Sequence, residues 1–175
     1  PGPNDNLSDD DAPGWIGDID LEMALNESGT VNATIIEFEF TSLASQVSFR
    51  YIFASEEYQI NDPNSCRYSD LFGFLIKPAS NITPYVNIAL VPDTTTPVKA
   101  TTVTPGVEGS CPPLNETYFN HYNGVDSPIN LNGQTEILTA VANVVPYETY
   151  HVKLVIADEK NYRYDSVVFL EANSF

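Results

Sequence analysis

Two stretches in the first third of the chain alternate between apolar and polar residues. Residues 36–40 read Ile-Glu-Phe-Glu-Phe, and residues 47–53 alternate in the same way. A period of two is typical of a β-strand with one buried face. The stretch Ser-Leu-Ala-Ser at 42–45 between them reads as a hairpin turn. The pattern therefore predicts two paired strands in which Glu37 faces Arg50.

More strands are expected further along the chain. The runs at 71–76 and 167–170 are apolar on both faces, as central buried strands are. The only helix expected spans 18–25, with Asp18 as its N-cap. The further strands are expected at 71–77, 85–91, 98–104, 135–143, 150–157 and 167–172.

The spacing of these elements predicts an all-β fold. The 13 prolines and 9 glycines fall mainly between the apolar runs. Many short strands with turns between them indicate an antiparallel β-sandwich of jelly-roll type. No repeat or boundary divides the pattern, so residues 1–175 are expected to form one domain. Within it, 1–14 reads as an extended acidic segment, and 105–134 as a long loop of a length that is usually functional or flexible.

The net charge of the chain excludes some classes of binding partner. Seven Lys and Arg against 24 Asp and Glu give a net charge of −17. A chain this acidic is not expected to bind nucleic acid or an anionic membrane, since both require a basic face. The charge suits calcium, which takes several oxygen ligands, but an acidic surface is also simply soluble. No apolar run spans a bilayer and no signal peptide opens the chain, which we interpret as a mature or excised form.

Carboxylates stand at the ends of several expected strands. They come from distant segments, and they would repel one another unless they lie apart or share a cation. No contiguous EF-hand loop joins them. The residues alone leave two interpretations open, separate solvated loop ends or one calcium site. The candidate ligands are Glu56, Glu57, Asp70, Asp158 and Asp165.

The two cysteines, Cys66 and Cys111, lie in polar, turn-rich loops. In a secreted domain they would pair, and the closed loop would add roughly 4 kcal/mol in the chain-entropy model. In a cytosolic protein they would be two unrelated thiols. Neither a Cys-x-x-Cys motif nor a histidine pair accompanies them, so they make a poor zinc site.

Catalytic motifs are missing from the sequence. It contains no Gly-x-Ser-x-Gly and no His-Glu-x-x-His, and His121 and His151 read as surface residues. Glu56 with Asp165 would suit glycoside hydrolysis, but any group of acidic loops gives that signal. We therefore expect no enzymatic activity.

Tyrosines in the loops suggest a ligand surface. Aromatic faces next to Asn and Asp are used to bind sugars or peptides. The alternative is that these rings seal the loops onto the ends of the sandwich. The candidate ligand-binding residues are Tyr58, Tyr68, Tyr118, Tyr122 and Tyr162, with Phe119 and Tyr164 beside them.

Two glycosylation patterns occur. The Asp-Thr-Thr at 93–95 resembles the short acceptor pattern for O-glycans in bacteria with type IX secretion, which makes Thr94 a candidate. The pattern Asn-x-Ser/Thr would mark glycans in a secreted eukaryotic protein. It occurs at Asn6, Asn26, Asn32, Asn81 and Asn115.

Taken together and in order, the motifs resemble the choice-of-anchor L family of bacterial surface and secreted proteins. The resemblance covers nearly the whole chain, and its most specific part is Phe-Ala-Ser-Glu-Glu-Tyr at 53–58. The family's Asn-Asp-x-Phe-Gly-Phe becomes Ser-Asp-Leu-Phe-Gly-Phe at 69–74. Other matching segments are Gly2-Pro3-Asn4, Asp18-Ile19-Asp20-Leu21, 36–40, 87–92, 96–98, 148–154, 156–158 and 164–175.

The resemblance implies an extracellular module with a role in adhesion or surface structure and no catalytic activity. Family members belong to large proteins that end in varied anchors or secretion signals, often of the type IX kind. The acidic candidates coincide with the motif positions, so the resemblance favours a shared role such as calcium binding. Many members carry a cysteine where this chain has Tyr147. By that comparison Cys111 is left as the partner of Cys66.

Members also usually carry a strand-rich segment before the Gly-Pro-Asn. If such a segment is lacking, we expect an unpaired sheet edge, which is a template for another strand. The alternative is that processing removed the segment. We therefore expect a non-catalytic extracellular module, calcium-stabilised, that assembles with other chains into a surface fibre or filament, as a homo-oligomer or with other surface proteins. The alternative is a carbohydrate-binding module that uses the tyrosine-rich loops to bind extracellular glycans.

Overall fold

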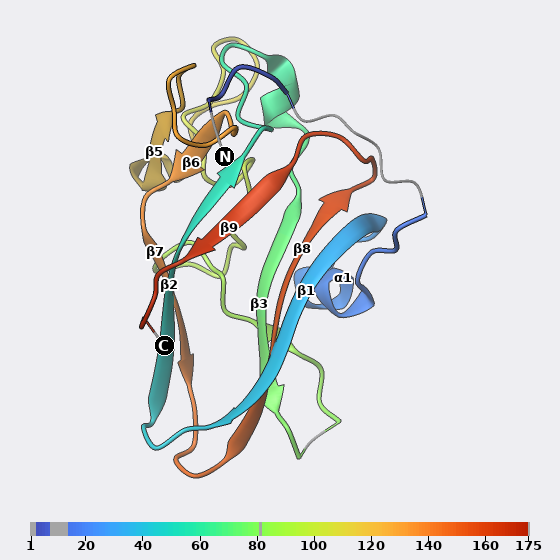
Figure 1. The fold of residues 1–175 in the computed structure, drawn as a ribbon, viewed down its shortest axis with the longest axis vertical. Helices are drawn as coiled ribbons and strands as arrows, with labels where there is room; N and C mark the ends of the chain where they lie inside the picture. The colour runs from blue at the N-terminus through green and yellow to red at the C-terminus, as the bar shows by residue number, and fades with distance from the viewer. Residues whose placement is uncertain (1–2, 8–13, 81, 175) are drawn as a thin grey trace.

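Two antiparallel sheets face each other across an apolar core (Figure 1). The computed structural model describes residues 3–7, 14–80 and 82–174. One sheet has the order β1-β8-β3-β4, and the other has the order β5-β6-β2-β7, with β9 on the free side of β2. The strands are β1 (Thr30–Thr41), β2 (Gln46–Ser55), β3 (Leu71–Pro78), β4 (Val86–Asn87), β5 (Phe119–Tyr122), β6 (Gly133–Thr135), β7 (Leu138–Asn143), β8 (Thr149–Glu159) and β9 (Ser166–Leu170). The helical elements are α1 (Ile19–Leu25) and the 3-10 turns η1 (Pro63–Cys66) and η2 (Glu116–Tyr118).

The expected all-β sandwich is confirmed. The chain crosses between the sheets from β1 to β2, β2 to β3, β4 to β5, β7 to β8 and β8 to β9, an alternation that jelly rolls share. Among the described residues, the one α-helix is where the sequence predicts it. The Asp18 side chain accepts a hydrogen bond from the backbone N–H of Leu21 at 2.8 Å, and Asn26 ends the helix in the left-handed conformation.

The predicted hairpin between 36–40 and 47–53 is wrong. β1 pairs with β8, whereas β2 pairs with β7, β6 and β9, so the two segments lie in opposite sheets. Glu37 lies opposite Lys153, and Arg50 forms its ion pair with Glu171 at 2.6 Å. A period of two does not distinguish strands that pair from strands that face each other across a core.

Aromatic rings fill the space between the sheets. Phe49 of β2 packs on Phe74 of β3, with ring centroids 4.8 Å apart. β3 is buried on both faces from Leu71 to Ile76, as expected for a central strand, because α1 covers its outer face. A second, smaller core forms there from Leu21, Leu71, Leu75, Val155 and Ala157.

Several sequence expectations differ from the structure. β9 is not a central strand, since β2 is its only strand partner in the described part of the chain and it exposes 36–47 % of Val167, Phe169 and Leu170. The expected strand at 98–104 is a series of turns whose apolar residues fill the core. The loop at 105–134 contains η2, β5 and the start of β6. Much of the expected acidic segment, residues 1–2 and 8–13, lies outside the described residues.

Candidate functional site

Four strand ends meet at one end of the sandwich, the upper end in Figure 1. Antiparallel pairing of β3 with β8 sets Leu71 opposite Ala157, and pairing of β2 with β9 sets Ser55 opposite Ser166. The residues that flank these pairs are the acids that the sequence singled out. We call them the acidic cluster, which consists of Glu56, Glu57, Asp70, Asp158 and Asp165.

Burial makes this cluster electrostatically unusual. Glu56, Glu57 and Asp70 are 0–3 % exposed, Asp158 is half-buried and Asp165 is exposed. Loss of hydration raises the pKa of Glu57 to about 7, with further contributions from the charges of Asp158, Glu56 and Glu159. It likewise raises the pKa of Asp158 to about 6 and that of Asp70 well above its ordinary value. The charged neighbours that shift these pKa values are all carboxylates.

Hydrogen bonds link the strand ends at the cluster, and the one between Ser166 and Asp70 joins the two sheets. The Ser166 hydroxyl donates to Asp70 Oδ2 at 2.5 Å, and the backbone N–H of Glu56 donates to the carbonyl oxygen of Asp165 at 3.0 Å. The Asn32 amide donates to Asp158 Oδ2 at 3.0 Å. These bonds hold segments from β1, β2, β3, β8 and β9 against one another.

Asn32 belongs to this site although sequence reasoning did not select it as a ligand. The register of β1 against β8 shifts between Val31 and Thr34, which marks a bulge, and Asn32 adopts a left-handed φ of 53° within it. Bulges re-aim side chains beside functional sites. The sequence did contain a signal for Asn32, namely an asparagine inside an otherwise β-type run. Strands are depleted in Asn, and Asn tolerates the positive φ of a bulge.

A cavity of about 280 Å³ opens beside the cluster. Its polar lining includes Asn32, Asp158, Asp165 and Ser166, and Trp15 forms part of the wall. Asn32 Oδ1 is buried and has no hydrogen-bond partner among the described residues. Two carboxylates and an orphaned amide oxygen are donors of the kind that calcium binds. The described residues contain no group of three or more His, Cys, Asp or Glu side chains arranged to hold an ion.

The candidate tyrosines do not form one surface. Tyr58 is 1 % exposed, and its hydroxyl donates to the carbonyl oxygen of Val103 at 2.9 Å, so it belongs to the core and is not available to a ligand. Tyr118 and Tyr122 are half-buried against that core. Tyr68 is 45 % exposed, and Tyr162 is half-buried. None of the five lines the cavity beside Asp158.

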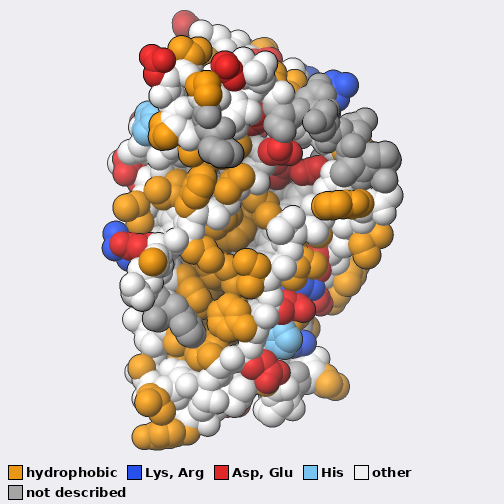
Figure 2. Space-filling view, in the orientation of Figure 1, with side chains coloured by type: hydrophobic (Ala, Val, Ile, Leu, Met, Phe, Trp, Pro, Cys, Tyr) orange, Lys and Arg blue, Asp and Glu red, His pale blue; other side chains and the backbone are white. Residues whose placement is uncertain are grey.

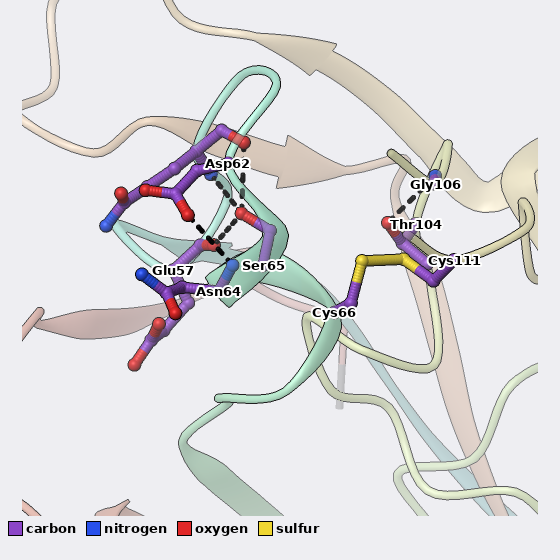
Figure 3. The surroundings of a disulfide bond; sticks show 9 residues. Glu57, Asp62, Asn64, Ser65, Cys66, Thr104, Gly106 and Cys111 are labelled. Atoms are coloured by element: carbon purple, nitrogen blue, oxygen red, sulfur yellow. Dashed lines mark hydrogen bonds between the residues drawn. A yellow bond between two sulfur atoms is a disulfide. The ribbon is translucent and has the colours of Figure 1, made fainter. Parts of the chain in front are cut away.

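The disulfide between Cys66 and Cys111 is confirmed, with an S–S distance of 2.03 Å (Figure 3). It ties η1 to the loop that precedes η2. Ser65, the neighbour of Cys66, donates its hydroxyl to the carbonyl oxygen of Glu57 at 2.8 Å. The covalent link therefore lies next to the segment that carries two acids of the cluster.

Thr94 and His151 lie apart from the cluster. Thr94 is exposed and donates its hydroxyl to the carbonyl oxygen of Val91, and its glycosylation stays a prediction. His151 stands towards the other end of β8, 3.7 Å from Glu39. No helix in the described part of the chain is long and apolar enough to span a membrane.

Comparison with known proteins identifies a family. The family model described as the choice-of-anchor L domain matches residues 1–175, the whole chain. Neither the curated proteins nor the solved structures give a match.

Proposed function

Because the chain belongs to the choice-of-anchor L family, which indicates a surface-associated module of bacteria, we propose that it is a non-catalytic extracellular domain for adhesion or surface structure. The proposal includes a calcium ion that stabilises the folded domain, assembly with other chains into a surface fibre, and export by the type IX route. The observation that carries the calcium part is the cavity beside the acidic cluster.

A calcium ion would compensate the negative charge of the carboxylates that the fold brings together in the acidic cluster. Carboxylates taken out of water and placed beside one another need a proton or a cation, and no basic group is among the neighbours that shift their pKa values. Asp158, Asp165 and the orphaned Oδ1 of Asn32 would hold the ion, with waters completing the shell. Bound there, calcium would supply positive charge that favours the ionised state of Asp70 and Glu57, both of which are under the influence of the Asp158 charge.

The alternatives receive less support. A glycoside hydrolase that used Glu56 with Asp165 would need both carboxylates beside an open cleft, but Glu56 is fully buried. A carbohydrate-binding module would need exposed aromatic faces, and three of the five candidate tyrosines pack onto or into the core. We therefore favour a structural role.

The test is a thermal melt in EDTA and in millimolar calcium, combined with calorimetric titration. Extracellular calcium modules bind with a Kd of about 0.1–1 mM. About tenfold saturation then adds roughly 1.4 kcal/mol to the free energy of unfolding. The variant Asn32→Gly keeps the positive φ but removes the amide oxygen, so it should lose most of this gain. The matched control is Asn61→Gly, because Asn61 also has a positive φ (57°) but lies outside the cavity.

Two results would count against calcium. One is a melting temperature that calcium leaves unchanged together with a flat titration. The other is an Asn32→Gly variant that responds to calcium as strongly as Asn61→Gly does, which would place the ion away from the cavity beside Asn32.

A further inference from the structure

The sandwich is open along one side, between β1 of one sheet and β9 of the other. A cavity of about 300 Å³ runs there, and its lining is mostly apolar and comes from both sheets. Ile36 of β1 and Leu170 of β9 line it and are 56 % and 47 % exposed. Figure 2 shows apolar side chains gathered over the region between these two strands. We call this opening the β1–β9 groove.

The edge of β1 that borders the groove is largely unpaired. Over Thr34–Thr41 the described residues supply no strand partner for β1 other than β8, which lies on its opposite edge. At its start the same strand already accepts an antiparallel neighbour, since the N–H groups of Asn32 and Ala33 donate to the carbonyl oxygens of Trp15 and Ile16. The edge thus has the geometry for strand addition beyond this bridge.

The charges on β1 indicate which kind of strand could pair with its free edge. The groove side of β1 carries Ile36, whereas Glu37 and Glu39 point to the other face and are exposed. A second copy paired edge to edge through β1 would bring these glutamates towards their equivalents, and each copy has a net charge of −17. A strand with Lys or Arg at these positions would instead complement them.

We propose that the free edge of β1 binds an extended segment of another protein chain, with branched apolar residues at alternate positions and Lys or Arg between them. The apolar side chains fill the β1–β9 groove, and the basic side chains lie beside Glu37 and Glu39. This inference rests on the proposed function, because it names the partner through which a surface module would assemble.

The probe is a labelled twelve-residue peptide of alternating valine and lysine, and its binding is measured by fluorescence polarisation. A peptide of the same composition ordered Val-Val-Lys-Lys carries the same charge but cannot present one apolar face. We expect the alternating peptide to bind at least about tenfold more tightly. Hydrogen exchange should show that amides within 34–41 become protected when it binds.

Variants on the two faces of β1 test the location. Ile36→Gln and Leu170→Gln should each weaken binding by about tenfold or more. Ile35→Gln is the matched control, because Ile35 is also exposed (42 %) but does not line the groove. Its affinity should stay within about twofold of the wild type. Melting curves of all three variants verify that each is folded.

Several results would overturn the proposal: no binding of the alternating peptide at about 1 mM, equal binding of the two peptides, an equal loss in Ile35→Gln, or no added protection in 34–41. Each measurement is made in EDTA and in calcium. Peptide binding without a calcium effect on melting would overturn the calcium site alone, and a calcium effect without peptide binding would overturn the docking strand alone.

Discussion

The Ser166 hydroxyl donates a hydrogen bond to Asp70 Oδ2 across 2.5 Å, and this bond joins the first residue of β9 to the residue that precedes β3. The two residues belong to opposite sheets, so the bond closes the end of the sandwich. The Ser55 hydroxyl lies 2.8 Å from that of Ser166 and accepts from the N–H of Glu57. A carboxylate that is 3 % exposed is thereby placed at the centre of the acidic cluster.

Asp70→Asn should stabilise the domain in EDTA and reduce its response to calcium. The amide has the same shape and still accepts from Ser166, but it carries no charge that burial penalises. We expect the melting temperature at pH 8 to rise by roughly 2–4 °C, as about 1 kcal/mol does in a chain of this size. The control is Asp126→Asn in an exposed loop, which should leave the melting temperature unchanged. A lower melting temperature of Asp70→Asn in EDTA would mean that the ionised carboxylate stabilises the fold.

The stability of the ion-free domain should fall as the pH rises from about 4 to about 7. Folding raises the pKa of Glu57 from its ordinary 4.5 to about 7, because the group is buried and faces Asp158, Glu56 and Glu159. A carboxyl with a raised pKa holds its proton more tightly in the folded chain, so its favourable contribution is present at low pH. It is lost as the pH rises from the unfolded pKa to the folded one. Asp70 and Asp158 are shifted in the same direction.

Melting temperatures measured in EDTA at half-unit pH steps test this slope. Calcium should flatten or reverse it, because the ion favours the ionised carboxylates. Glu57→Gln should also flatten it. If stability in EDTA instead increased over this window, the cluster would be ionised in the folded protein without any cation.

Sequence patterns predicted strands better than they predicted partners. The alternation at 36–40 and 47–53 located β1 and β2 correctly, but it contains no information on which sheet each strand joins. The inward rings of Phe38 and Phe49 meet across the core, with centroids 6.5 Å apart, and the alternation only records that each faces apolar neighbours. Glu37 and Arg50 therefore acquired different partners from those expected.

The site was predictable to the extent that its residues stand at strand ends. The five acids were selected for that reason, and the antiparallel registers bring four of these ends together. Asn32 was noticed only within a glycosylation pattern, because its position depends on a bulge whose register no local pattern defines. Tyr58 was expected on a ligand surface, but turn-forming loops fold over it, and its ring packs on Phe119 at 5.1 Å.

Removal of the disulfide should cost much of the stability of the domain. Cys66 and Cys111 are 45 residues apart, and closing a loop of that length adds roughly 4 kcal/mol in the chain-entropy model. We expect the double variant Cys66→Ser/Cys111→Ser to unfold at a lower denaturant concentration, because its free energy of unfolding is reduced by about that amount. Treating the double variant with reductant is the control, since it should change nothing further. A loss below about 1 kcal/mol would mean that the hydrogen bonds of Ser65 hold η1 without the link.

Lys153 should be among the charged residues whose loss is most costly. Its side chain is 8 % exposed, forms an ion pair with Asp18 and lies 2.8 Å from Asp20, so it joins β8 to the N-terminus of α1. Lys153→Met would leave the buried Asp18 carboxylate unpaired, which costs roughly 3–5 kcal/mol in such pairs. Lys77→Met, which removes an ammonium 4.3 Å from the Tyr85 ring, should cost no more than about 1 kcal/mol. Chemical denaturation of both variants measures the difference.

A double variant separates the lost pair from simple loss of packing. Asp18→Asn keeps the N-cap, because asparagine caps as well as aspartate, but removes the charge. Adding it to Lys153→Met should therefore recover part of the lost stability, since the carboxylate that needs a partner is gone. If Asp18→Asn brings no recovery, or if Lys153→Met costs no more than Lys77→Met, then the Lys153 side chain stabilises the junction of β8 and α1 through its aliphatic stem and not through its charge.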